Sequence, residues 1–223
     1  MHRKRLHGLY AITDATPRPW TELVRLCDAI LRGGASVLQY RDKSAETALR
    51  RKTAGALLEI CNAHDALLII NDDVQLAAAV GAHGVHLGRD DTSLQEAREQ
   101  LGEEAVIGIS CYNQLERAEA AAAGGADYLA FGSFFPSPTK PRAVRATPDL
   151  LGEAKRRFSL PLVAIGGITP ENGATLVQAG ADMLAVISGV FQQPDPRQAA
   201  TRYCRLFEDR QPASTGAQGR KST

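Results

Sequence analysis

The chain has 223 residues, of which 44% are hydrophobic and 23% are charged, and this length is enough for one large domain or two small ones with a packed core. Its 26 lysines and arginines nearly balance its 25 aspartates and glutamates, which excludes binding of nucleic acid or an anionic membrane by bulk charge. No window approaches the roughly 18 apolar residues of a membrane span, and the basic start lacks the apolar core of a signal peptide, so we expect a cytoplasmic protein.

The cysteines agree with that location. They lie far apart in the sequence and none forms a C-x-x-C pair, which is typical of buried or incidental thiols in a reducing compartment. They are Cys27, Cys61, Cys111 and Cys204.

Eight short apolar runs predict strands. Most are apolar at consecutive positions, as in a parallel sheet that is covered on both faces. In chain order they are 8–13, 36–41, 67–72, 84–88, 106–110, 128–132, 162–166 and 183–188.

Segments with apolar residues three and four positions apart alternate with these runs and predict helices. In chain order they are 20–32, 45–64, 74–80, 94–101, 115–123, 148–158, 171–179 and 196–207. Glycines close several of them. Three endings look alike, which indicates a repeated unit: Gly33-Gly34-Ala35-Ser36, Gly124-Gly125-Ala126-Asp127 and Ala179-Gly180-Ala181-Asp182.

Eight strand-then-helix units predict an α/β protein with a single (β/α)₈ TIM barrel over residues 1–208. A doubly wound parallel sheet is the structural alternative. Residues 209–223 are rich in small and polar types and are predicted to be a disordered tail. At the other end, His2 and His7 are expected at a disordered edge of the fold.

In such a barrel the active site lies at the carboxyl ends of the strands. Polar residues follow the second to fifth predicted strands, and we expect them to face one mouth. They are Gln39 to Lys43, Asn71 to Asp73, Arg89 to Asp91 and Ser110.

Asp72 and Asp91 put carboxylates at two adjacent strand ends, which is the arrangement that Mg²⁺ uses when it shares phosphate oxygens with a substrate. Asp73 is expected to cap the following helix, and Asp90 to be solvated. Cationic Arg41, Lys43 and Lys140 should converge on the same mouth, which favours a metal together with a polyanionic ligand.

Two later loops are candidates for phosphate binding. The connection 132–141 is long and carries Ser137, Thr139 and Lys140, which suits a lid that reaches a phosphate, although an exposed stiffened loop is the alternative. Glycines and a hydroxyl follow the seventh and eighth predicted strands, where barrels commonly hold a phosphate monoester through backbone N–H groups.

The remaining reactive side chains have simpler interpretations. His86 lies inside a predicted strand and is interpreted as a hydrogen-bonded barrel residue rather than as a base. No histidines form a metal pair at helical spacing. No base can be paired with Cys111, so a nucleophilic thiol is not expected.

Five motifs in this order resemble thiamine phosphate synthases over roughly residues 8–207. They are Gln39-Tyr40-Arg41-Asp42-Lys43, Ile70-Asn71-Asp72-Asp73, Gly84-Val85-His86-Leu87-Gly88, Pro136-Ser137-Pro138-Thr139-Lys140 and Ala164-Ile165-Gly166-Gly167-Ile168. The resemblance implies a barrel enzyme that joins 4-amino-2-methyl-5-(diphosphooxymethyl)pyrimidine to a thiazole phosphate carboxylate, with release of thiamine phosphate, pyrophosphate and CO₂. It implies a dissociative reaction, in which pyrophosphate leaves before the thiazole nitrogen attacks.

The resemblance also implies roles for individual residues. Asp72 and Asp91 correspond to the Mg²⁺ ligands. The pyrimidine diphosphate site corresponds to Gln39, Tyr40, Arg41, Asp42, Lys43, Asn71, Ser110 and Lys140. Of these, Arg41, Lys43, Ser110 and Lys140 are expected to act in catalysis. The thiazole phosphate site corresponds to Ser137, Pro138, Thr139, Gly167, Ile187 and Ser188.

Two departures from the family pattern bear on the alternatives. Tyr112 stands where many relatives carry a histidine, which leaves the support of Ser110 open, and the stretch 141–145 is more basic than expected. The competing functions are a thiazole tautomerase of the same fold, in which a histidine of that region moves the proton, and a non-catalytic regulator that binds thiazole phosphate. The missing histidine and the full set of acids and bases favour the synthase. Its partners are expected to be small molecules, and a homo-oligomer is compatible with the sequence.

Overall fold

The computed structural model describes residues 2–43, 46–136 and 144–208. Eight parallel strands pair in sequence order, and β8 pairs back with β1, so the sheet closes into a barrel. The strands are β1 (Gly8–Ile12), β2 (Val37–Tyr40), β3 (Leu67–Asn71), β4 (Gly84–Leu87), β5 (Val106–Tyr112), β6 (Tyr128–Gly132), β7 (Leu162–Ile165) and β8 (Met183–Val186).

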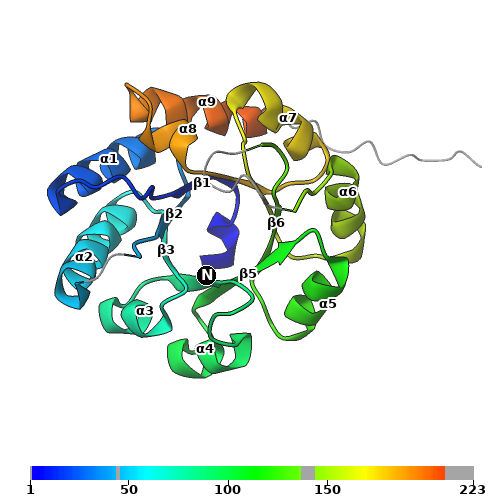
Figure 1. The fold of residues 1–223 in the computed structure, drawn as a ribbon, viewed down its shortest axis with the longest axis horizontal. Coiled ribbons are helices and arrows are strands. Elements are labelled where there is room, and N and C mark those ends of the chain that lie inside the picture. Colours follow the sequence, from blue (N-terminus) through cyan, green and yellow to red (C-terminus); the bar gives the residue numbers. More distant parts are fainter. Residues whose placement is uncertain (1, 44–45, 137–143, 209–223) are drawn as a thin grey trace, which may run out of the picture.

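Helices surround the barrel as an outer ring (Figure 1). In the described ranges they are α1 (Trp20–Arg32), α2 (Thr47–Ala63), α3 (Val74–Val80), α4 (Leu94–Leu101), α5 (Leu115–Ala123), α6 (Pro148–Arg157), α7 (Pro170–Gln178), α8 (Ser188–Phe191) and α9 (Pro196–Glu208), with a 3-10 helix η1 (His2–Arg5) before β1. None of these described helices has both the length and the apolar character needed to span a lipid bilayer.

The predicted (β/α)₈ barrel is confirmed, and the pairing of β1 with β8 rules out an open doubly wound sheet. Most predicted bounds agree with the structure to within two residues, and two differences have a clear cause. β5 continues to Tyr112 because a register shift after Ser110 restores its pairing with β6. The short helix α8 follows β8 directly, and its four residues are too few to display a helical period.

Side chains of each strand alternate between two core layers. The inner layer fills the barrel and contains strand residues such as Tyr10, Leu67 and Tyr128, together with Leu6. The outer layer contains their strand neighbours and the apolar faces of the helices. This double coverage explains why the strands are apolar at consecutive positions.

The N-terminal segment belongs to the fold, so the expectation of a disordered edge at His2 is wrong. Residues 2–5 form η1, and Leu6 is only 3% exposed because it packs into the inner layer. The His2 ring meets the His83 ring edge to face at 5.1 Å. Apolar packing of Leu6 therefore holds a segment whose own composition gives no such signal.

A tight turn precedes each even-numbered strand, and its sequence is Gly-Ala-X. The three similar endings found in the sequence are confirmed, and Gly81-Ala82-His83 is a fourth. In all four, the glycine has a positive φ, between 69° and 118°, which a side chain would strain. The X residues are Ser36, His83, Asp127 and Asp182.

The X residue binds the neighbouring odd-numbered strand. Asp127 N–H donates to the Ile107 carbonyl, and the Asp127 carboxylate accepts the Ile107 N–H, both at 2.8 Å. Asp182 brackets Leu162 in the same way, and His83 brackets Leu68 through its Nδ1. Ser36 differs, since its N–H donates to the Leu9 carbonyl while its hydroxyl donates to backbone carbonyls.

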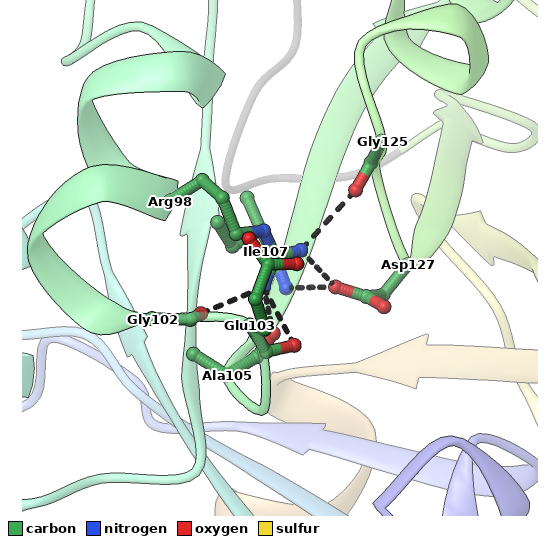
Figure 2. A network of polar contacts seen from close by, with 7 residues as sticks. All are labelled: Arg98, Gly102, Glu103, Ala105, Ile107, Gly125 and Asp127. Atoms are coloured by element: carbon green, nitrogen blue, oxygen red, sulfur yellow. Dashed lines mark hydrogen bonds and ion pairs between the residues drawn. The ribbon is translucent and has the colours of Figure 1, made fainter.

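Arg98 reinforces one of these turns (Figure 2). Its guanidinium donates to the Asp127 carboxylate at 2.8 Å and to carbonyl oxygens of Ala105 and Gly125 at 2.6 and 3.2 Å, as well as to two carbonyls at the end of α4. One side chain thus joins α4 to the turns before β5 and β6, at the face of the barrel opposite the strand carboxyl ends.

Candidate active site

Acidic and basic side chains converge where β2, β3 and β4 end. They line an open cavity of about 520 Å³. Its lining includes Asp42, Lys43, Arg50, Asp72, Asp73 and Asp91. The acids and the lysine that the sequence predicted for one mouth are therefore brought together.

The two predicted metal ligands have defined neighbours. The Asp72 carboxylate accepts a hydrogen bond from Asn71 Nδ2 at 2.7 Å and lies 3.5 Å from Lys43 Nζ. The Asp91 carboxylate accepts the Gly88 N–H at 2.6 Å, which fixes the loop after β4. Asp72 itself has a left-handed backbone with φ of 56°, so its carboxylate is placed by an unusual turn directly after β3.

The neighbouring acids behave as the sequence suggested. Asp73 caps α3 by accepting the Leu76 N–H at 2.8 Å, which confirms its structural role, and it also pairs with Arg50 at 2.9 Å. Asp90 is exposed to solvent. The sequence pattern does not single out Arg50, because this residue lies in the first turn of α2 and not among the polar residues that directly follow β2.

Side chains of the segment 39–43 lie on both sides of the barrel wall. Gln39 points inward and is 3% exposed. Tyr40 lies in the outer layer, where burial raises its pKa, so it stays protonated and donates to Asp42 at 2.9 Å. The Arg41 N–H donates to Thr13 Oγ at 2.8 Å. The side chain of Tyr40 therefore supports Asp42 and does not point into the barrel.

Ser110 sits at the half-buried end of a hydrogen-bonded chain that leads into the barrel. Its Oγ lies 2.8 Å from His86 Nε2, and His86 Nδ1 lies 3.0 Å from the Tyr128 hydroxyl. The Tyr128 and Tyr10 hydroxyls are 2.8 Å apart, and Gln39 Nε2 donates to the Tyr10 hydroxyl at 2.7 Å. The interpretation of His86 as a hydrogen-bonded barrel residue is confirmed, and it supplies the support for Ser110 that the sequence left open.

Tyr112 does not occupy the place of a catalytic histidine against Ser110. Its ring lies beneath two guanidinium groups, at 5.1 Å from Arg89 and 5.8 Å from Arg117. Arg117 also donates to the Ser110 carbonyl at 2.6 Å. Burial raises the pKa of nearby Cys111 to about 12, which agrees with the expectation that its thiol is no nucleophile.

A second cavity, of about 370 Å³, opens after β7 and β8 on the same face of the barrel. Gly167, Ile187 and Ser188, all predicted for the thiazole phosphate site, line it. Tyr203 of α9 donates to the Ile168 carbonyl at 3.0 Å and so anchors the loop after β7 from behind. Nothing in the helical period of α9 distinguishes this tyrosine from an ordinary core residue.

The glycines after β7 also allow the loop after β6 to pack closely against them. A Cβ on Gly166 would overlap Ser133, and one on Gly167 would overlap the Pro136 carbonyl. Phe134 and Phe135 N–H groups donate to the carbonyls of Ile165 and Gly166 at 3.1 and 2.9 Å. The loop after β6 is thus seated on the end of β7, and its Pro136 lines the second cavity.

The predicted residues Ser137, Pro138, Thr139 and Lys140, and with them the tip of the proposed lid, lie outside the described residues. So does the predicted tail, 209–223. In the part that is described, Cys27, Cys61 and Cys111 are buried free thiols and Cys204 is half-buried, as the sequence predicted.

Known proteins with this sequence pattern point to one function. A family model described as thiamine monophosphate synthase matches residues 9–190. The chain is 54% identical over 205 residues to the thiamine-phosphate synthase of Thioalkalivibrio sulfidiphilus, covering 92% of this chain and 97% of that protein. It is 53% identical over 202 residues to the thiamine-phosphate synthase of Nitrosococcus oceani, covering 91% and 93%.

A solved structure agrees with these sequence matches. The thiamine phosphate pyrophosphorylase from Pyrococcus furiosus superimposes with a TM-score of 0.81 at 36% identity, covering 92% of this chain and 97% of that one. The family match spans most of the barrel, including every segment that lines the first cavity and the strand-end loops of the second, but not Gln192 and Gln193. The chain therefore belongs to the thiamine monophosphate synthase family and is a transferase that makes thiamine phosphate.

Proposed function

We propose that the barrel mouth joins 4-amino-2-methyl-5-(diphosphooxymethyl)pyrimidine to a thiazole phosphate carboxylate, releasing pyrophosphate and CO₂. The observation that carries this proposal is the pair of cavities on one face of the barrel. The first is lined by carboxylates and cationic groups, and the second by glycine-containing loops. A two-substrate reaction between a diphosphate and a monophosphate needs both kinds of site.

The first cavity suits the pyrimidine diphosphate. Lys43, together with Arg41 and Lys140, supplies positive charge for the diphosphate, and Asn71 and Ser110 supply polar contacts. Of these cations, Lys43 lines the cavity. Cationic groups placed around the leaving pyrophosphate would stabilise the charge that grows on it, so no covalent nucleophile is needed.

The donor set fits a Mg²⁺ ion held by Asp72 and Asp91. The described residues contain no group of three or more His, Cys, Asp or Glu that could hold a metal, and the proposed site uses two carboxylates. That is the usual share for Mg²⁺, which keeps waters and takes its remaining ligands from substrate phosphates. A bound Mg²⁺ would supply charge neutralisation for the departing pyrophosphate.

The second cavity suits the thiazole phosphate. Loops after the seventh and eighth strands of a barrel commonly bind phosphate beside the start of a short extra helix, and α8 begins at Ser188 in this chain. Gly167, Ile187 and Ser188 are proposed to hold the phosphate, together with Ser137, Pro138 and Thr139, which lie outside the described residues. In this dissociative scheme the thiazole nitrogen attacks the pyrimidine cation after pyrophosphate has left.

The cellular location and the partners of the enzyme are part of the same proposal. The free thiols suit a reducing cytoplasm, and the expected partners are the two small-molecule substrates. A homo-oligomer stays a prediction from the sequence.

Pyrophosphate release tests the proposed function. Purified protein is given the pyrimidine diphosphate and the thiazole phosphate carboxylate, with Mg²⁺ and again with EDTA. We expect metal-dependent release that requires both substrates. Release that is unaffected by EDTA would overturn the metal proposal. Isomerisation of the thiazole carboxylate without any pyrophosphate would replace the synthase with a tautomerase.

A further inference from the structure

The buried chain behind Ser110 has a direction that follows from its chemistry. An amide Nε2 can only donate, so Gln39 donates to the Tyr10 oxygen at 2.7 Å. The other contact recorded for that hydroxyl among the described residues is Tyr128, at 2.8 Å. The Tyr10 O–H can therefore make a hydrogen bond only if it donates to the Tyr128 oxygen.

The same reasoning extends to the histidine. With Tyr128 already accepting from Tyr10, its own proton points to His86 Nδ1, which lies 3.0 Å away. Burial raises the pKa of both tyrosines far above its ordinary value, so both hydroxyls keep their protons. An imidazole that accepts at Nδ1 is neutral and carries its proton on Nε2.

The proton on Nε2 then faces Ser110 Oγ at 2.8 Å. Because His86 donates to the serine oxygen, the serine proton is not used by the histidine. It is available to a ligand in the mouth of the barrel.

We infer that Tyr10, Tyr128 and His86 form a positioning relay that turns the Ser110 hydroxyl into a hydrogen-bond donor toward an acceptor atom of the pyrimidine diphosphate. The inference rests on the proposed pyrimidine site and adds to it. Gln39 and Ser110, which the resemblance to the family assigns to the same substrate, are the two ends of one hydrogen-bonded chain.

The barrel is shaped to hold this relay. Gly108 is paired with Tyr128 between β5 and β6, and a Cβ at Gly108 would overlap the Tyr128 ring. The rings of His86 and Tyr128 stack at 5.6 Å with an interplanar angle of 14°. The Tyr10 and Tyr128 rings meet nearly at right angles, at 5.9 Å. These contacts leave each hydroxyl little freedom to choose another partner.

Nitrogen NMR of the histidine rings tests the direction without using activity. At pH 7.5 we expect His86 to be the neutral Nε2–H tautomer, with its signals identified by their loss in His86→Asn. A neutral Nδ1–H tautomer or an imidazolium would overturn the inference. In Tyr128→Phe the Nδ1 partner is gone, and we expect a mixture of tautomers.

Tyr203→Phe is the matched control for this measurement. It also removes one buried tyrosine hydroxyl, which donates to the Ile168 carbonyl, but it leaves the relay untouched. We expect the His86 tautomer to be unchanged in this variant, and a shift there would mean that the signal reports general loosening.

Kinetics test the role toward substrate. Losing one directed hydrogen bond should lower kcat of Tyr128→Phe roughly ten-fold, with the KM for thiazole phosphate unchanged. On a Ser110→Ala background the same change should have no further effect, whereas an equal loss on both backgrounds would show a merely structural role and overturn the inference. Should Tyr128→Phe fail to fold, Tyr10→Phe tests the relay one step earlier.

Failure of the proposed function is recognised separately. If the wild-type protein releases no pyrophosphate from both substrates, the proposed reaction falls and the donor role of Ser110 falls with it. If the wild-type protein is active and the tautomer is wrong, only the relay is overturned.

Discussion

Asp72, a proposed Mg²⁺ ligand, has a left-handed backbone conformation. Asp72 has a φ of 56° immediately after β3, a backbone conformation that aspartate and asparagine tolerate better than other non-glycine residues. Its side chain is 29% exposed and lies 3.5 Å from Lys43 Nζ. Asp72→Asn can therefore remove the charge while keeping the backbone and the hydrogen-bonding shape.

We expect Asp72→Asn to cripple turnover while the melting temperature stays close to that of the wild type, because the carboxylate charge is proposed to hold Mg²⁺. Steady-state pyrophosphate release and thermal unfolding measure the two quantities. Asp90→Asn removes an exposed carboxylate from the loop after β4 and should keep its activity. Full activity in Asp72→Asn would remove the metal assignment.

At the scale of elements, the Arg98 and Asp127 pair ties one helix to two strands (Figure 2). The side chains are 15% and 2% exposed, so removal of the arginine leaves a buried carboxylate without its counter-charge. Because the pair lies far from the strand carboxyl ends, its role is stability and not chemistry.

Arg98→Met is expected to lower the free energy of unfolding by about 3–5 kcal/mol, with kcat of the folded protein unchanged. Urea titration and pyrophosphate release are the measurements. Arg157→Met breaks an exposed ion pair with Glu119 and should change stability very little. Equal losses in the two variants would contradict the argument from burial.

At the scale of the whole molecule, the N-terminal segment makes stability depend on pH. Burial, followed by the charges of His2 and Arg5, lowers the pKa of His83 from 6.5 to about 4. Between these two values the unfolded chain binds more protons than the folded one, so stability falls as the pH drops from 6.5 toward 4. The pKa of His2 is lowered mainly by burial and contributes with the same sign.

We expect the wild-type protein to lose more stability between pH 7 and pH 5 than His83→Gln does. Glutamine keeps an acceptor for the Leu68 N–H, which His83 Nδ1 binds at 2.9 Å, but it cannot take up a proton. Denaturant unfolding of both proteins at the two pH values makes the comparison. Parallel losses would show that the pH dependence arises elsewhere.

The sequence predicted the barrel and most element boundaries because hydrophobic period and glycine turns are local signals. It also predicted the acids of the first cavity, since each directly follows a strand. It could not predict that Tyr40 faces the helices while Gln39 faces inward, because apolar residues occupy both sides of the wall. Arg50 and the Tyr10–Tyr128 contact depend on three-dimensional neighbours that no local pattern records.

The Gly-Ala-X turns divide the adjacent strand pairs of the barrel wall into two kinds. His83, Asp127 and Asp182 each make a double contact, with hydrogen bonds to both the N–H and the carbonyl of one residue of the preceding odd strand. A shift of the strand register by one residue would therefore break two hydrogen bonds at once. In the described part of the chain, the pairs formed by an even strand and the next odd strand have backbone bonds without this double contact. Thermal opening of the wall should therefore begin at a strand pair that lacks this double contact. Amide hydrogen exchange should be faster across β2–β3 or β4–β5 than across β3–β4 or β5–β6.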